Sequence, residues 1–245
     1  MKKIILIETS TSLCSVALAE DGAVTAYRES SAPKAHASLT AVFIQEVLKE
    51  RGLKLADCDA VCVSKGPGSY TGLRVGVSTA KGLCFGSGKP LLAVGTLDTL
   101  VAQSTEVEIP GQAGNDDKDG NDDKDGNGWK YIIPMIDARR MEVYSAVFTP
   151  DGRQISETTP VIVDENSFAD YMSEGQVLFI GDGAGKCADV IKHPNALFCQ
   201  CNPKASAMLR PAMDAYEKKQ FEDTAYFEPF YLKEFVATVS KKKLF

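Results

Sequence analysis

The sequence predicts an α/β protein built from two similar lobes, each with a mixed sheet covered by helices. Residues 4–28 and 132–156 share one pattern: an apolar strand ending in an acid, a polar turn, a second apolar strand and an Asp-Gly turn. Further along, residues 60–70 and 177–185 each run from an apolar strand into a glycine-rich turn, followed by a helical pattern. The same order of elements in both halves indicates a duplicated lobe.

Each hairpin of this repeat follows from local signals. In the first copy an apolar strand ends at Glu8, and a second strand is expected over Leu13–Ala19. In the second copy the strand Trp129–Ile136 leads to Asp137, and a second strand is expected over Glu142–Phe148. Short apolar runs bounded by turn residues are typical of such hairpins.

The lobes are expected to be residues 1–106 and 130–245, and residues 107–129 between them have a different composition. This segment reads NDDKDG twice in succession and carries most of the chain's net charge of −6. It cannot bury apolar surface, so an acidic, disordered linker is expected. A calcium loop is the alternative, because Asn115 starts an EF-hand-like spacing; the twelfth position, however, is Gly126 instead of a chelating Glu.

Two helices are expected in the first lobe. Ala35–Arg51 has apolar residues at helical spacing and is followed by Gly52, a typical stop signal. The second helix, Thr71–Gly86, is expected to be capped by the Thr71 hydroxyl, which can accept hydrogen bonds from free amides of the first turn.

Small residues recur every four positions in the second helix, at Gly72, Gly76 and Ala80. A glycine inside a helix costs about 0.5–1 kcal/mol relative to alanine, so close packing should compensate for it. The backbone that approaches can belong to the sheet of the same lobe or to another protein. The sequence leaves both interpretations open.

Composition narrows the function classes. The negative net charge argues against a strongly basic nucleic-acid binder. No apolar run approaches the roughly 20 residues of a membrane span, and the few apolar residues before Glu8 are too short for a secretory signal. We therefore expect a cytoplasmic protein without membrane contact. The odd number of cysteines, seven, fits this, and Cys199 and Cys201 lack the further ligands of a zinc site.

The glycine-rich turns are candidate ligand loops. GPGSYTG at 66–72 lacks the lysine of a Walker loop, so it is expected to seat the helix that follows. GDGAG at 181–185 lies between a strand and a helix, where α/β folds often bind ligands. No glycine closely follows Glu8 or Asp137, so a backbone clasp for phosphate should be degenerate. The candidate residues of this vestigial nucleotide site are Glu8, Ser10, Asp137, Gly181 and Gly183.

A duplicated lobe with an acid at the end of each first strand is similar to the two-lobed plan of the actin/Hsp70/sugar-kinase superfamily, a ribonuclease H-like fold. Within it, the sequence resembles the TsaB family along nearly the whole chain, excepting the acidic insert. The 66–83 segment is the most specific, and the order of the others adds weight. The matching segments are IETSTSLCSVAL at 7–18, GPGSYTGLRVGVSTAKGL at 66–83, IDARRMEVY at 136–144, GDGA at 181–184 and PFYLKE at 229–234.

The resemblance implies a non-catalytic bacterial subunit in the biosynthesis of N6-threonylcarbamoyladenosine at position 37 of tRNA. Its implied partners are the catalytic paralogue TsaD, a TsaE-type ATPase and a second copy of itself, with tRNA reached only through the complex. No catalytic residue, metal or required cofactor is expected in this chain, and ATP or ADP should bind weakly. The expected partner interface comprises Leu39, Phe43, Tyr70, Thr71, Gly72, Arg74, Val75, Gly76, Ser78 and Thr79.

The first expected helix lacks one of the two histidines that the resemblance to TsaD would lead us to expect there. TsaD carries two metal-binding histidines there, whereas this chain has His36 followed by Thr40. One imidazole cannot hold a catalytic metal for which about three protein ligands are usual. The family commonly has Glu where this chain has Ser38. Two alternatives stay open: an ATP-dependent small-molecule kinase of the same superfamily and, less favoured for want of a nucleophile–base pair, a peptidase.

Overall fold

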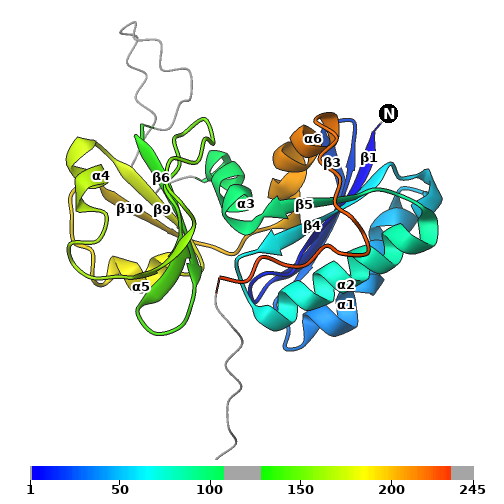
Figure 1. Ribbon diagram of the computed structural model, residues 1–245, viewed down its shortest axis with the longest axis horizontal. Coiled ribbons are helices and arrows are strands. Elements are labelled where there is room, and N and C mark those ends of the chain that lie inside the picture. The colour runs from blue at the N-terminus through cyan, green and yellow to red at the C-terminus, as the bar shows by residue number, and fades with distance from the viewer. Residues whose placement is uncertain (1, 108–127, 233–245) are drawn as a thin grey trace, which may run out of the picture.

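The computed structural model describes residues 2–107 and 128–232 and forms two five-stranded sheets with helices packed on both (Figure 1). The predicted acidic linker, with its NDDKDG repeat and calcium-loop alternative, lies almost entirely outside the described residues. The last two residues of the PFYLKE segment lie outside them as well.

The first sheet has the strand order β3-β2-β1-β4-β5. Its first three strands are antiparallel, while β1, β4 and β5 are parallel to one another. Both faces of β1 are buried because helices cover the two sides of the sheet. The strands are β1 (Lys3–Glu8), β2 (Cys14–Glu20), β3 (Ala23–Ser30), β4 (Ala60–Gly66) and β5 (Leu91–Gly95).

The second sheet repeats this topology. Its order is β10-β9-β6-β7-β8, with β6, β7 and β8 antiparallel and β6, β9 and β10 parallel. Read from the other edge, this is the order of the first sheet, so the predicted two-lobed fold with a mixed sheet in each lobe is confirmed. The strands are β6 (Tyr131–Asp137), β7 (Glu142–Ser145), β8 (Thr159–Ile162), β9 (Val177–Gly181) and β10 (Ala196–Gln200).

Helices α1 (Ala35–Glu50) and α2 (Tyr70–Ser87) pack side by side on one face of the first sheet (Figure 1). The two predicted helices are therefore confirmed, but the predicted cap is wrong. Ser69 occupies the N-cap position of α2, and its side chain accepts the Gly72 amide, because Thr71 already lies inside the first turn.

Two of the remaining helices each pack on the sheet of the other lobe. Helix α3 (Thr96–Gln103) follows the first sheet in sequence but packs on the second, whereas α6 (Leu209–Glu217) returns to the uncovered face of the first sheet. Short helices α4 (Ala169–Glu174) and α5 (Ala184–Ala188) complete the second lobe. The 3₁₀ turns are Leu55–Asp57, Ser104–Glu106 and Ala205–Met208.

The chain after α6 runs back along the first lobe, from β5 to α2 (Figure 1). The Glu222 amide donates to the Leu91 carbonyl at 2.8 Å, and the Phe230 amide donates to the Lys65 carbonyl at 2.7 Å. The described part of the PFYLKE segment therefore belongs to the first lobe. Among the helices of the described residues, none is long and apolar enough to cross a membrane.

Candidate functional site

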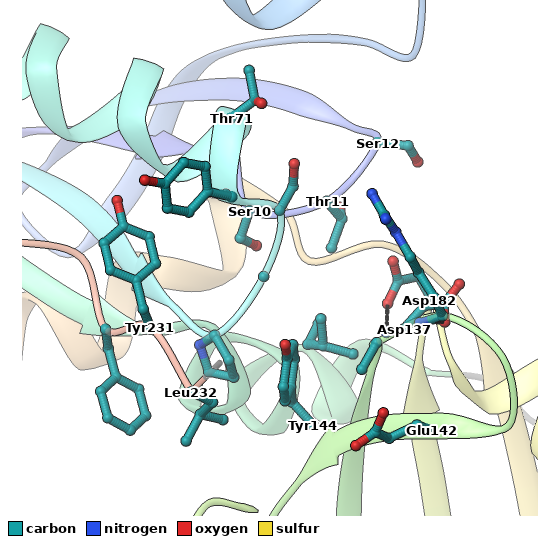
Figure 2. Close-up of a pocket in the computed structure, with 18 of the residues that line it drawn as sticks. Ser10, Thr11, Ser12, Thr71, Asp137, Glu142, Tyr144, Asp182, Tyr231 and Leu232 are labelled. Atoms are coloured by element: carbon teal, nitrogen blue, oxygen red, sulfur yellow. Dashed lines mark hydrogen bonds between the residues drawn. The ribbon is translucent and has the colours of Figure 1, made fainter. Parts of the chain in front are cut away.

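A cleft of about 840 Å³ lies where the two lobes meet. Residues 10–12, which connect β1 to β2, and residues 67–71, which lead into α2, line it from the first lobe (Figure 2). From the second lobe come residues 136–140 and Asp182, and residues 230–232 close one side. The two hairpins that the sequence repeat identifies therefore face each other across the same space.

Glu8, the acid that ends β1, lies beneath this cleft instead of lining it. One of its oxygens accepts the Ser10 amide at 2.6 Å, and the other has no hydrogen-bond partner among the described residues. Burial raises the pKa of its carboxyl from 4.5 to about 7, and the nearby Ser10 and Ser64 groups offset only part of that rise. Near neutral pH this carboxyl is therefore divided between its protonated and ionised forms.

Several polar groups around Glu8 are buried without a partner among the described residues. They are the hydroxyls of Thr9, Ser10 and Thr11 and the Nε2 atom of His36. An unsatisfied buried polar group costs about 1–3 kcal/mol, so these groups favour a polar ligand or solvent beside them. Ser10, Thr11 and His36 line the cleft, so a polar ligand or solvent molecule bound there could satisfy their hydrogen-bonding groups.

The glycine stripe of α2 faces the loop after β1. A Cβ atom at Gly72 would overlap the Thr9 carbonyl oxygen, and one at Gly76 would overlap the Thr9 hydroxyl. In the same way, Gly68 leaves no space for a side chain beside Ser10, whose carbonyl accepts the Ser69 amide at 2.6 Å. Packing inside one lobe, the first interpretation that the sequence left open, therefore accounts for both helix glycines.

Two acids meet on the opposite wall of the cleft. Asp182 accepts the backbone amide of Asp137 at 2.9 Å (Figure 2), and burial raises the pKa of the Asp182 carboxyl to about 6. Asp137 accepts the Arg139 amide at 2.8 Å and pairs with the Lys186 ammonium. Asp182 was missed by the sequence reasoning, although it lies between the two candidate glycines Gly181 and Gly183.

The glycines of this turn are required by tight packing. Gly181 has a φ of +136°, and a Cβ there would overlap the Met135 carbonyl. Gly183 donates its amide to the same carbonyl at 3.0 Å, and the Gly185 amide donates to the Gln200 side chain at 2.5 Å. These amides, like those of Ser10, Asp137 and Arg139, are already bonded within the chain, so the clasp that backbone amides would offer to phosphate is largely closed.

Arg139 and Arg140 add positive charge to the cleft. Both are exposed and have left-handed backbone conformations, with φ of +70° and +51°. Neither guanidinium has an ion pair or hydrogen bond among the described residues. The two guanidinium groups and the hydroxyls of Ser10 and Thr11 are therefore available as hydrogen-bond donors in the cleft.

The residues expected at a partner interface divide by exposure. Gly72, Gly76 and Phe43 are buried inside the first lobe and offer no outer surface. Leu39, Tyr70, Val75 and Thr79 are half-buried, and Thr71, Arg74 and Ser78 are exposed.

Tyr70 and Arg74 also contact the chain's own returning segment. The rings of Tyr70 and Tyr231 lie 4.9 Å apart, and the Arg74 guanidinium stacks 4.1 Å from the centre of the Tyr70 ring. Arg74 Nε donates to the Tyr231 hydroxyl at 3.4 Å.

Two apolar side chains on the outer faces of these helices were missed. Val42 of α1 is 40% exposed, and Phe85 of α2 is 88% exposed. Phe85 could have been found, because it follows Ser78 at helical spacing on the side opposite the glycine stripe.

Thr40, which follows His36 by four residues in α1, has a structural role. Thr40 is buried, and its hydroxyl donates to the His36 carbonyl at 2.6 Å and lies 3.4 Å from the Cys14 sulfur. Within residues 2–107 and 128–232, no cluster of three metal-ligating side chains is present.

Two lobes of one topology around a cleft define a two-lobed α/β protein of the actin/Hsp70/sugar-kinase type. Within this class the chain is TsaB-like. It is 29% identical over 242 residues to the tRNA threonylcarbamoyladenosine biosynthesis protein TsaB of Escherichia coli (strain K12), covering 96% of both chains. Its identity to the protein of that name from Bacillus subtilis (strain 168) is 29% over 184 residues, 73% of this chain and 70% of the relative.

Structure and a family model agree with this likeness. The solved structure of YeaZ from Pseudomonas aeruginosa superposes with a TM-score of 0.75 at 25% identity, covering 95% of this chain and 100% of YeaZ. Residues 29–112 match the family model "TsaD: tRNA N6-adenosine threonylcarbamoyltransferase". The resemblance to the TsaB family that the sequence predicts is therefore confirmed.

Proposed function

We propose that this chain is a non-catalytic subunit that binds and supports a TsaD-type partner in the biosynthesis of tRNA N6-threonylcarbamoyladenosine at position 37. The TsaB relatives named for this biosynthesis support the process. The partner role rests on one observation: Val42 and Phe85 project apolar side chains from the outer faces of α1 and α2, whose inner faces are already packed.

The outer face of α2 has the shape of a helix-docking surface. Its exposed positions recur every three or four residues, so they form one stripe along the helix. Small residues occupy the middle of the stripe and let another helix approach closely, while burial of the Phe85 ring would contribute about 1.5–3 kcal/mol. The stripe consists of Thr71, Arg74, Ser78, Gly82 and Phe85.

On this proposal a second copy of this chain would bind through the same outer face of α2. Self-association and partner binding would therefore compete for it. The TsaE-type ATPase and tRNA join through the TsaD-type partner. Two observations support a non-catalytic role: the Thr40 hydroxyl, four residues after His36, donates to the His36 carbonyl, and the Asp137 and Arg139 amides are bonded within the chain. ATP or ADP is at most a weak ligand, and the kinase alternative has less support for the same reason.

The test is calorimetric titration of this chain into the TsaD-type protein of the same organism, with outward-facing variants. Ser78→Arg and Phe85→Ala should each weaken binding at least tenfold, because one inserts a bulky charge into the stripe and the other removes its apolar contact. Ser173→Arg is the matched control, since Ser173 is an exposed helical serine on α4 in the other lobe.

Gly76→Arg is unsuitable here because Gly76 is buried against Thr9, so that variant would disrupt folding instead of binding. Unchanged affinity in both outward-facing variants would contradict the α2 surface. No binding by the folded parent chain would contradict the subunit role. Mg²⁺-dependent phosphoryl transfer by the isolated chain would favour the kinase alternative.

A further inference from the structure

Strand β10 (Ala196–Gln200) and the residue that follows it carry two thiols on one face, Cys199 and Cys201. Among the described residues β10 is an edge strand that pairs with β9, and its side chains alternate between the two faces of the sheet. Leu197, Cys199 and Cys201 pack on the face covered by α3, whereas Phe198 packs on the other. Both thiols are free and only half-buried.

These two thiols differ from the other five cysteines, all of which are buried. Burial raises the pKa of those thiols, to about 11 for Cys58, Cys84 and Cys187, which keeps them protonated and inert. In contrast, the neighbouring Cys201 thiol lowers the pKa of Cys199 to about 7. Since the thiolate is the nucleophile, Cys199 is the reactive member of the pair.

The residue between the two thiols holds one wall of the cleft. The Gln200 side chain donates to the Asp182 carbonyl at 2.9 Å and accepts the Gly185 amide at 2.5 Å. Immediately afterwards the Asn202 carbonyl accepts the side chain of Gln103, at the end of α3, at 3.1 Å. The Gln200 side chain thus connects the backbone between the two cysteines to the Asp182–Gly185 turn.

A disulfide between these two residues would change that backbone. Two residues that lie two positions apart in an extended strand have Cα atoms roughly 6.6 Å apart. The Cα–Cα distance in disulfides is about 4.4–6.8 Å, so this separation lies near the upper end of that range. Because the commonest separation in disulfides is about 5.5–6 Å, closure would shorten the Cα–Cα distance and strain the two hydrogen bonds of the intervening Gln200.

We propose that Cys199 and Cys201 form a redox-active dithiol, which a peroxide closes to a disulfide and whose closure releases the Asp182–Gly185 turn of the cleft. The Cys199 thiolate attacks one oxygen of the peroxide, giving a sulfenic acid and, from hydrogen peroxide, one water after protonation. The Cys201 sulfur then attacks the sulfenic sulfur; an S–S bond forms and the hydroxyl leaves as a second water. Two thiols and one hydrogen peroxide thus yield one disulfide and two waters.

The test begins with stoichiometric hydrogen peroxide on the full chain near neutral pH, followed by alkylation and tryptic mapping. Both cysteines lie in the peptide 193–204, which should become about 2 Da lighter and resist alkylation until dithiothreitol is added. In the control variant Cys201→Ser, the same peptide should instead gain oxygen, since Cys199 then has no resolving thiol. Amide exchange at residues 183–185 should rise several-fold on oxidation and return to its former rate after reduction.

Two results would overturn the proposal. Complete alkylation after peroxide, or an oxygen adduct in the parent chain, would show that the thiols do not pair. A disulfide without faster exchange at residues 183–185 would show that closure leaves the cleft turn in place. Binding of the TsaD-type partner is measured separately on α2, so failure of one proposal is distinguishable from failure of the other.

Discussion

At the scale of single residues, the buried Glu8 carboxyl is the most sensitive to pH. Its folded pKa of about 7 lies above the unfolded value of 4.5. The unfolded chain therefore loses this proton first, and folded stability falls as pH rises from about 4.5 to 7, by roughly 3 kcal/mol in total. Glu8→Gln should remove this loss and make the chain more stable than the parent at pH 8.

Denaturant unfolding between pH 5 and pH 8 measures this effect. Glu165→Gln, at an exposed position of the second lobe, is the control and should follow the parent curve. A parent chain whose stability does not fall over this range, or a Glu8→Gln variant that follows it, would contradict the assignment.

The sequence predicted individual positions better than their partners. Glu8 and Asp137 could be recognised because each ends an apolar strand before a polar turn. The neighbours that determine their chemistry are distant in sequence: Asp182 bonds the Asp137 amide from 45 residues away. For the same reason, the direction of the α2 glycines was undetermined until Thr9 could be placed beside Gly76.

At the scale of elements, α2 has two faces on which glycine has opposite consequences. Gly76→Ala should destabilise the fold by about 1–3 kcal/mol, because the added methyl overlaps the Thr9 side chain. Gly82→Ala should stabilise it by about 0.5–1 kcal/mol, because that position is exposed and open and alanine favours the helix.

Thermal or denaturant unfolding of the two variants beside the parent measures both changes. The pair serves as its own control, since the substitution and the helix are the same and only the face differs. A change of the same sign in both variants would contradict the inward orientation of Gly76.

Some elements could be predicted from the sequence better than others. Both hairpins and the first-lobe helices were predictable because their signals are local, as in the apolar spacing of Ala35–Arg51. The sides covered by α3 and α6 were not predictable, since an apolar helix face fits either sheet. Tertiary packing alone decided that each of these helices covers the sheet of the other half.

At the scale of the whole molecule, the closed amides of the cleft predict weak nucleotide binding. The isolated chain should bind Mg²⁺-ATP with a dissociation constant near 1 mM, that is about −4 kcal/mol. The side chains of Arg139 and Arg140 are available to hold the phosphates. Replacing both by alanine should weaken binding further.

Calorimetry or ligand-detected NMR measures this affinity, with an exposed pair elsewhere, Lys218→Ala and Lys219→Ala, as the charge-matched control. Micromolar binding by the parent chain would show that the clasp opens for phosphate. Equal losses in both double variants would show that the attraction is not confined to the cleft.

The exchange of helices has a consequence for how the chain is made. On a ribosome, β1–β5 emerge first, but the helix that seals the second face of their sheet, α6, ends only at Glu217. At synthesis rates of about 5–20 residues per second, the apolar face of the first sheet that α6 covers stays exposed to solvent for roughly 10 s. During that interval the incomplete chain can bind chaperones or aggregate with other nascent chains. A chain that is truncated before α6 would keep this apolar face exposed.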